Sequence, residues 1–169
     1  MRVIGIDPGT RLAGYGVIDV EGPRLRLVEC GAAATPRGAS VAERLAAIYE
    51  KLVEVVRRTR PDEGVIEEVF YDKNAKSAIT IGEARGVALL VLAQEGVAVS
   101  EFTPAEVKRA VTGNGRAAKH QVAAMVARIL ALEASPEPAD AADALACAIA
   151  FAHRAGRPAG WPAGRGGAR

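Results

Sequence analysis

Short apolar runs alternate with longer stretches of helical spacing along this chain. The first three runs, residues 3–6, 15–20 and 25–33, have the length of β-strands and are separated by turns that contain Gly, Pro or charged residues. Runs of this length with such turns between them are typical of strands. The N-terminal part of the chain therefore predicts an antiparallel meander of three strands.

Helical spacing begins at Ser40, which forms a capping-box pattern with Glu43. Apolar residues then recur every three or four positions to about residue 58, which predicts a helix. Two further strands are predicted over 64–70 and 97–102, with a helix over 75–94 between them. Because a strand–helix–strand connection is nearly always a right-handed crossover between parallel strands, these two strands should extend the sheet in parallel.

Helices predominate in the last part of the chain. A second capping box, Thr103 with Glu106, begins one helix, and Gly113-Asn114-Gly115 ends it. Two more helices are predicted over 116–132 and 139–153. Together these elements predict an α/β fold with a five-stranded mixed sheet, its first three strands antiparallel, flanked by helices.

The composition fits a folded, soluble protein, because half of the residues are hydrophobic and a quarter are charged. No apolar run approaches the roughly 18 residues of a membrane span, and the N-terminus lacks a signal-peptide pattern, so a cytoplasmic protein with no membrane association is expected. One domain is expected over 1–155, followed by a disordered Gly/Pro/Arg-rich tail over 156–169. The net charge is +2, but residues 152–169 carry four arginines and no acid, a pattern that permits nucleic-acid binding without proving it.

Asp7 stands at the end of the first strand, directly before the turn Pro8-Gly9. An aspartate at the end of a buried strand is costly to desolvate, and a bound cation or a phosphate–metal complex would offset that cost. The alternative is that the Asp7 side chain caps the turn. The neighbouring residues do not decide between the two interpretations.

Three further acids occupy positions that otherwise belong in a core. Glu67 lies in the predicted strand 64–70, and Asp140 and Asp143 lie three residues apart on one face of an alanine-rich helix. Capping of the helix N-terminus accounts well for Asp140 and less well for Asp143. Four carboxylates from two strands and a helix suit a pair of hard cations such as Mg²⁺ or Mn²⁺, and such a pair favours phosphodiester hydrolysis.

Four motifs follow one another in the order found in a known family. They are I-G-I-D-P-G-T with G-Y-G-V close behind, I-E-E-V-F, V-K-x₄-G-x-G-x₃-K and A-D-A-A-D-A-L-A. Over roughly residues 1–153 the chain therefore resembles the RuvC Holliday-junction resolvases. The resemblance implies an RNase H-like fold, a homodimer, and metal-dependent, symmetric nicking of four-way DNA junctions during recombination and repair. It also implies a branch-migration helicase complex as a partner.

The family motifs assign roles to the acids. In the family pattern the acid lies three residues before the phenylalanine, so Phe70 selects Glu67 over Glu68. The resemblance thus implies two Mg²⁺ ions per subunit, with Mn²⁺ able to substitute, held by four catalytic acids: Asp7, Glu67, Asp140 and Asp143.

Basic and aromatic residues near these motifs match the family's DNA contacts. Phe70 is expected to wedge between bases near the junction centre, and the role of its neighbour Tyr71 stays open. Lys119 is expected beside the scissile phosphate as a catalytic residue, with Lys108 further along the path of the strand. Weaker candidates for phosphate contacts are Lys73, Lys76, Arg85, Arg109 and Arg116.

The histidines and cysteines have simpler interpretations. His120 and His153 are expected at the surface, although His120 adjoins Lys119 and could approach an attacking water. Cys30 and Cys147 lack metal-ligand spacing and are expected to be buried, reduced thiols.

Three other functions share part of this pattern. An actin-type phosphotransfer fold also has a D-x-G-T turn after its first strand, but it needs a second domain and a second such turn, which this chain lacks. A junction binder without metal chemistry would be expected to have lost at least one of the four acids. A nuclease for RNA·DNA hybrids could use the same acids, and here the lysine motifs and Phe70 favour junctions.

Overall fold

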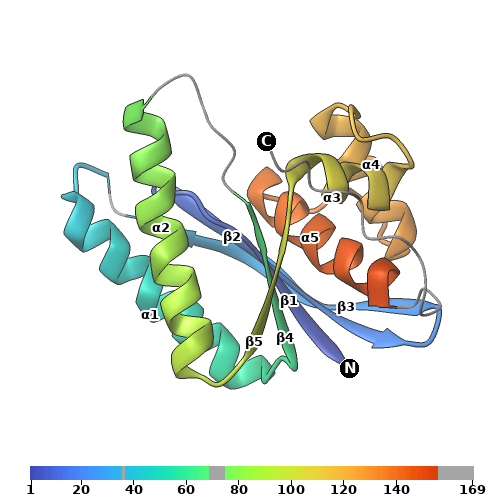
Figure 1. The fold of residues 1–169 in the computed structure, drawn as a ribbon, viewed down its shortest axis with the longest axis horizontal. Helices are drawn as coiled ribbons and strands as arrows, with labels where there is room; N and C mark the ends of the chain where they lie inside the picture. The colour runs from blue at the N-terminus through green and yellow to red at the C-terminus, as the bar shows by residue number, and fades with distance from the viewer. Residues whose placement is uncertain (36, 69–74, 156–169) are drawn as a thin grey trace, which may run out of the picture.

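A five-stranded sheet with helices on both faces forms the part of the protein that the computed structural model describes, residues 1–35, 37–68 and 75–155 (Figure 1). The strands are β1 (Arg2–Asp7), β2 (Leu12–Glu21), β3 (Arg24–Ala34), β4 (Glu63–Glu67) and β5 (Ala98–Phe102). The helices are α1 (Val41–Thr59), α2 (Ala75–Gln94), α3 (Pro104–Thr112), α4 (Lys119–Ile129) and α5 (Ala139–Ala155). Outside the described residues lie Phe70, Tyr71, Lys73, the side chain of Lys76 and the tail over 156–169.

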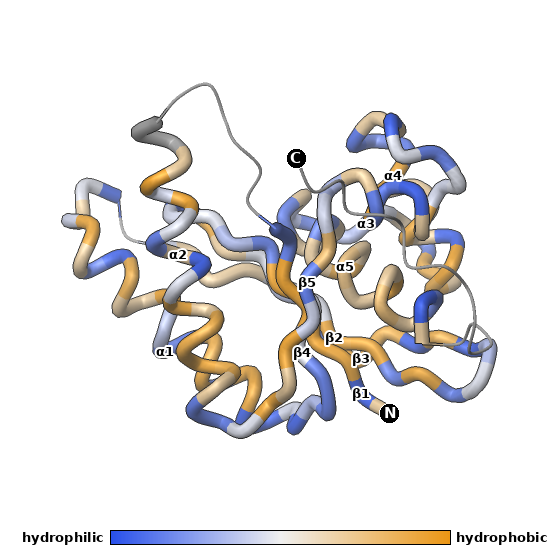
Figure 2. The backbone as a smooth tube through the Cα atoms, viewed as in Figure 1, coloured by the Kyte–Doolittle hydropathy of each residue, from blue (hydrophilic) through white to orange (hydrophobic). Residues whose placement is uncertain are grey.

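The strands lie in the order β3-β2-β1-β4-β5. β2 pairs antiparallel with both β1 and β3, whereas β4 and β5 extend the sheet from β1 in parallel. This arrangement confirms the predicted α/β fold, the antiparallel meander and the two parallel crossovers. Hydrophobic residues are concentrated along the central strands, as Figure 2 shows.

Each face of the sheet has its own core, because side chains alternate between the two faces along a strand. Ile4, Ile6 and Ile66 pack with α1 and α2, whereas Val3 and Val65 pack with α3, α4 and α5. Figure 1 shows these two helical layers on opposite sides of the sheet. Ten residues of α5 are buried, most of them alanine, so this helix lies close against the strands.

Several predicted boundaries differ from those observed: β2 begins at Leu12 and α4 ends at Ile129, each three residues earlier than predicted. β4 ends at Glu67, where its pairing with β5 ends at Phe102, and residues 69 and 70 of the predicted strand lie outside the described residues. α4 begins at Lys119, three residues later than predicted. There the Asn114 side chain accepts a hydrogen bond from the Arg116 backbone and holds the chain in a turn.

The histidines and cysteines differ in part from expectation. His120 is exposed as predicted, but His153 is half-buried, and its Nδ1 lies 2.9 Å from the carbonyl oxygen of Ala110, which joins α5 to α3. Both cysteines are free thiols, Cys147 buried and Cys30 half-buried. Among the described residues no helix is long and apolar enough to cross a membrane.

Candidate active site

Two of the four acids end neighbouring parallel strands. Asp7 is the last residue of β1 and Glu67 the last of β4, and the sheet pairs Ile6 with Ile66 just before them. Because the C-terminal ends of parallel strands meet at one edge of a sheet, the two carboxylates are neighbours there.

Side chains along β4 alternate between the two faces of the sheet, and this alternation determines whether Glu67 or Glu68 belongs to the site. Val65 packs with α5 and Ile66 with α1 and α2, so Glu67 is on the α5 side of the sheet. Glu68 follows the strand, and its backbone N–H donates to the carbonyl oxygen of Phe102 at 2.8 Å. The acid that the family motif selects is thus also the one on the side of Asp140 and Asp143.

Two glycines let α5 lie directly on the sheet. A Cβ atom at Gly14 would collide with the carbonyl oxygen of Asp140, and a Cβ atom at Gly5 would collide with that of Ala144. Gly14 is paired with Asp7 in the sheet. A close contact between the helix backbone and the sheet therefore lies beside the acids and brings the α5 carboxylates toward those of β1 and β4.

The strand pattern alone does not reveal this contact. The signal that could have predicted it is the spacing of Gly14 and Gly16, which puts both on one face of β2, together with Gly5 as the direct partner of Gly16. A Cβ atom at Gly16 would lie 2.9 Å from the backbone nitrogen of Leu145. Glycines on one face of a sheet, opposite an alanine-rich helix, indicate a close backbone approach.

Burial and like charge both act on the strand acids. Asp7 is half-buried, and its pKa is raised to about 7, mainly because its carboxylate is partly withdrawn from water. The carboxylates of Asp143, Glu67 and Asp140 add to the rise. The pKa of Glu67 is raised as well, first by burial and then by Asp143. The four acids from β1, β4 and α5 therefore share one electrostatic environment.

Lys119 supplies positive charge to this group. Its Nζ lies 2.8 Å from Oδ2 of Asp143, so the first residue of α4 is joined to α5. The hydrogen bond to Asp143 raises the pKa of Lys119, and the charges of Asp7 and Asp140 contribute to the rise. Lys119, which is predicted beside the scissile phosphate, thus has a specific partner among the acids, which the spacing of motifs did not identify.

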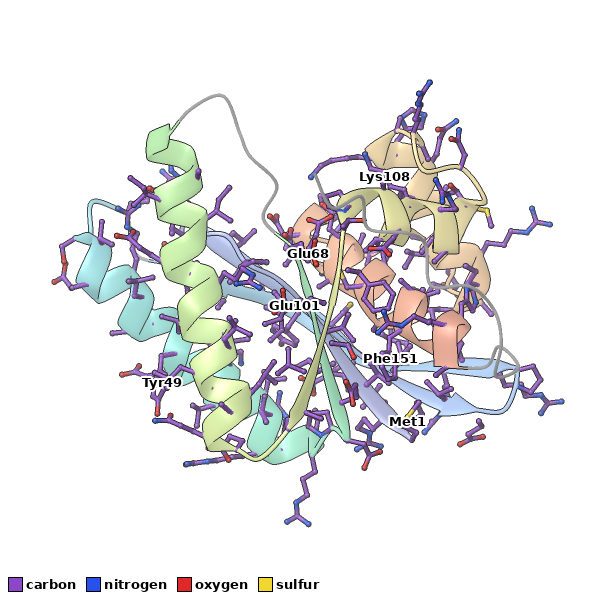
Figure 3. All side chains as sticks on the ribbon, in the orientation of Figure 1. Met1, Tyr49, Glu68, Glu101, Lys108 and Phe151 are labelled. Carbon is purple, nitrogen blue, oxygen red and sulfur yellow. The ribbon has the colours of Figure 1, made fainter. Side chains whose placement is uncertain are left out.

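Lys108 acts electrostatically on one of the acids. Its charge acts on Glu67 and lowers the pKa of that carboxyl, against the effect of burial. Figure 3 shows Lys108 on α3 at the same end of the molecule as Glu68, the residue directly after Glu67. The expected position of Lys108 further along the path of the DNA strand stays a prediction.

The other described candidates for DNA contacts have different surroundings. Arg85 on α2 donates to Glu101 on β5 at 2.5 Å, with 23% of its side chain exposed, so its charge is paired within the fold. Arg109 and Arg116 are exposed, on α3 and in the turn before α4.

The donor set suits hard cations. All four side chains offer carboxylate oxygens, the ligands that Mg²⁺ and Mn²⁺ prefer. Within the described residues no three His, Cys, Asp or Glu side chains are close enough together to enclose an ion. One oxygen of Asp143 is paired with Lys119 instead. The acids would therefore have to draw together around a metal, at the expense of that ion pair.

Comparison with known proteins identifies the family. The family described as crossover junction endodeoxyribonuclease RuvC matches residues 3–153. A crossover junction endodeoxyribonuclease RuvC from Pelotomaculum thermopropionicum is 52% identical over 153 residues, which are 90% of this chain and 93% of the relative. The structure of T. thermophilus RuvC in complex with Holliday junction substrate matches with a TM-score of 0.83 and 36% identity, covering 92% of this chain and 95% of that one. The yeast mitochondrial Holliday junction resolvase shares the fold, with a TM-score of 0.63 at 9% identity over 89% of this chain and 78% of that one. As its four motifs predict, the chain belongs to the RuvC family.

Proposed function

We propose that this protein resolves four-way DNA junctions by hydrolysing one phosphodiester bond in each of two symmetrically placed strands. The observation that carries this proposal is the mutual electrostatic influence of four carboxylates and two lysines from β1, β4, α3, α4 and α5, in a chain of the RuvC family. Relatives named crossover junction endodeoxyribonuclease support the reaction. The T. thermophilus structure with its Holliday junction substrate supports the class of DNA.

The four acids would hold the metal. Mg²⁺ is the expected cofactor, with two ions per subunit and Mn²⁺ as a substitute, and such ions activate water and stabilise charge on the phosphate when bound. To bind the metal, the four acids have to be ionised and held in position. Because the pKa of Asp7 is raised to about 7, the proton on this carboxyl has to leave before the ligand set is complete. Metal affinity should therefore fall as the pH drops below neutral.

Lys119 and Lys108 would bind the phosphate. An ammonium group is a compact charge with three donors, so it can stabilise the negative charge that grows on the phosphate oxygens in the transition state. Lys119 begins α4, where free backbone N–H groups also favour an anion. Lys108 would approach from α3, on the side of Glu67.

Further DNA contacts would surround this centre. Phe70 follows Glu67 by three residues and would act as a wedge between bases at the junction centre. Exposed Arg109 and Arg116 suit phosphate contacts, whereas Arg85 would first have to leave Glu101. The remaining proposed contacts are Tyr71, Lys73 and Lys76.

Cleavage of synthetic substrates tests this function. A four-way junction, a linear duplex and an RNA·DNA hybrid are each incubated with and without Mg²⁺, and the cut positions are mapped on every strand. We expect symmetric nicks in the junction only, and only with Mg²⁺. Preferential cutting of the hybrid would favour the hybrid nuclease, and tight junction binding without cutting would favour a binder without metal chemistry.

We infer that the active form is a homodimer, because two symmetric nicks need two active sites related by a two-fold axis. α2 supports this inference. Ile79 is 64% and Leu90 50% exposed, and their spacing of about three turns puts them on one face of the helix. Between them, Gly82 and Gly86 have no atom within 4 Å of the position of a Cβ. Glycines one turn apart allow two helices to approach closely, so the proposed contact is α2 against α2 of a second copy.

A charge on this face of α2 should break the dimer. Leu90→Asp and Ile79→Asp should each give a monomer in sedimentation experiments and lower the rate of paired nicking. Val41→Asp is the matched control, since Val41 is 40% exposed but lies on α1. A dimer that survives both α2 substitutions would contradict this interface.

A branch-migration helicase is the proposed protein partner, and the cytoplasm the proposed location. Both proposals follow from the role of the family in processing recombining DNA. Co-sedimentation of the protein with such a helicase on junction DNA would test the first, and the failure to form a joint complex would contradict it.

A further inference from the structure

The ammonium of Lys119 is paired with one of the four carboxylates and acts electrostatically on the others. Its Nζ is 2.8 Å from Oδ2 of Asp143 on α5. Its charge also lowers the pKa of Asp7 on β1 and of Glu67 on β4. One ammonium group thus reduces the repulsion among acids from three different elements.

The two ends of this ion pair differ in their freedom to move. Asp143 has 25% of its side chain exposed and stands on α5, whose backbone is packed on the sheet. The Lys119 side chain is 81% exposed and carries its charge at the end of a flexible four-carbon stem. Lys119 can therefore leave Asp143 by a change of rotamer, while Asp143 keeps its place.

An ammonium group and a metal ion compete for the carboxylate of Asp143. A divalent ion at the acids would take lone pairs of Asp143 and would repel a positive charge held beside it. The exposed Lys119 is the partner that can move away from Asp143. A lysine released there would stand next to the place where a phosphate has to bind.

We propose that Lys119 is the resident counter-ion of the metal-free site, that it gives up Asp143 when metal binds, and that it thereby becomes available to the scissile phosphate. This inference rests on the proposed function and deepens it. It makes metal and DNA phosphate cooperative ligands, since each favours the same position of Lys119. By linkage, the effect of metal on phosphate binding equals the effect of phosphate on metal binding.

Mn²⁺ binding without DNA tests the competition directly. The signal of free Mn²⁺ in electron paramagnetic resonance gives the affinity of the wild type and of Lys119→Met, which keeps most of the stem without the charge. We expect Lys119→Met to bind Mn²⁺ roughly tenfold more tightly, within the range usual for coupling between two ligands. Lys108→Met is the matched control, because Lys108 also acts on the acids but no ion pair to Asp143 is lost. The gain in Mn²⁺ affinity should be clearly smaller in Lys108→Met than in Lys119→Met.

Each outcome separates the inference from its alternatives. Equal gains in Lys119→Met and Lys108→Met would show a general effect of charge and overturn the counter-ion role. Unchanged or weaker Mn²⁺ binding in Lys119→Met would overturn it as well. A wild-type protein that binds no Mn²⁺ at all would instead overturn the proposed metal-dependent function, and the inference with it.

Chemical labelling of the wild type provides a test without any substitution. An amine-acylating reagent followed by mass spectrometry reports how free each lysine is. Mg²⁺ should raise the labelling of Lys119 severalfold and leave Lys51 unchanged, because Lys51 is paired with Glu54 at 2.9 Å on the distant helix α1. Labelling of Lys119 that does not respond to Mg²⁺ would overturn the proposal.

Discussion

The two ends of β1 hold charged residues in opposite ways. At the C-terminal end, Asp7 is half-buried beside other acids, and its pKa is raised to about 7. At the N-terminal end, the Arg2 guanidinium donates to both carboxylate oxygens of Asp19, at 2.8 and 3.1 Å, and to the carbonyl oxygen of Thr59 at 2.7 Å. These hydrogen bonds hold the pKa of Asp19 below its ordinary value.

The difference teaches which charges serve the fold and which serve the reaction. Asp19 is satisfied by Arg2, its direct partner across the β1–β2 ladder, so this end of the strand is complete without a ligand. Asp7 is surrounded by like charges instead, in a position that weakens the metal-free protein. Strongly perturbed acids that destabilise a fold are typical of functional sites.

The largest expected effect is the loss of cleavage when one acid is neutralised. Asp7→Asn, Glu67→Gln, Asp140→Asn and Asp143→Asn should each lower the single-turnover rate by roughly three decades or more, because several kcal/mol of transition-state stabilisation are lost. Junction binding should stay near that of the wild type. Asp19→Asn, on β2 opposite the other end of β1, should cleave normally. Cleavage that survives in any of the four variants would remove that acid from the catalytic set.

The second expected effect is a pH-dependent gain in stability. The raised pKa of Asp7 means that the folded, metal-free protein holds this proton more tightly than the unfolded chain. The stability that the proton contributes is complete below about pH 4 and is lost as the pH rises through about 7. Asp7→Asn should therefore be more stable than the wild type above pH 7, by up to about 4 kcal/mol, and similar to it near pH 4.

Urea unfolding in EDTA across this pH range measures the difference. A difference between Asp7→Asn and the wild type that is independent of pH would contradict the assignment. Saturating Mg²⁺ should reverse the order of stability, since the wild type alone keeps all four acids for the ion.

The third expected effect concerns the contact that brings α5 to the acids. Gly14→Ala would push the Asp140 backbone from the sheet and should cost about 1–3 kcal/mol of stability as well as most of the metal affinity. Gly31→Ala is the matched control on β3, because its Cβ would meet the hydroxyl of Tyr15, an atom at the end of a side chain. Gly31→Ala should lose less stability than Gly14→Ala and should keep the metal affinity of the wild type. Equal metal affinity in both variants would argue against a positioning role of Gly14.

The smallest expected effect is at the N-terminal end of β1, where Arg2 and Asp19 form an ion pair. Asp19→Asn should cost about 1 kcal/mol, because partly exposed ion pairs contribute little. The sign of its pH dependence is opposite to that of Asp7: the contribution of Asp19 is present above about pH 4 and is lost as the pH falls. A stability difference that grows toward low pH would contradict this interpretation.

The sequence by itself determined the elements and the set of acids. Both predicted capping boxes, Ser40 with Glu43 and Thr103 with Glu106, begin helices as expected. Caps, turns and apolar periodicity act within a few residues, so a linear sequence contains the whole of their cause. The collinear motifs likewise identified the family, and with it the fold and the expected catalytic acids.

Only the tertiary structure decided how these parts meet. The motif chose Glu67 by position, but the packing of Val65 shows which side of the sheet its carboxylate is on. The ion pair of Lys119 with Asp143 joins residues 24 positions apart, and the contact of Gly14 with Asp140 joins strand to helix across most of the chain. Such contacts depend on where whole elements pack, which local pattern does not determine.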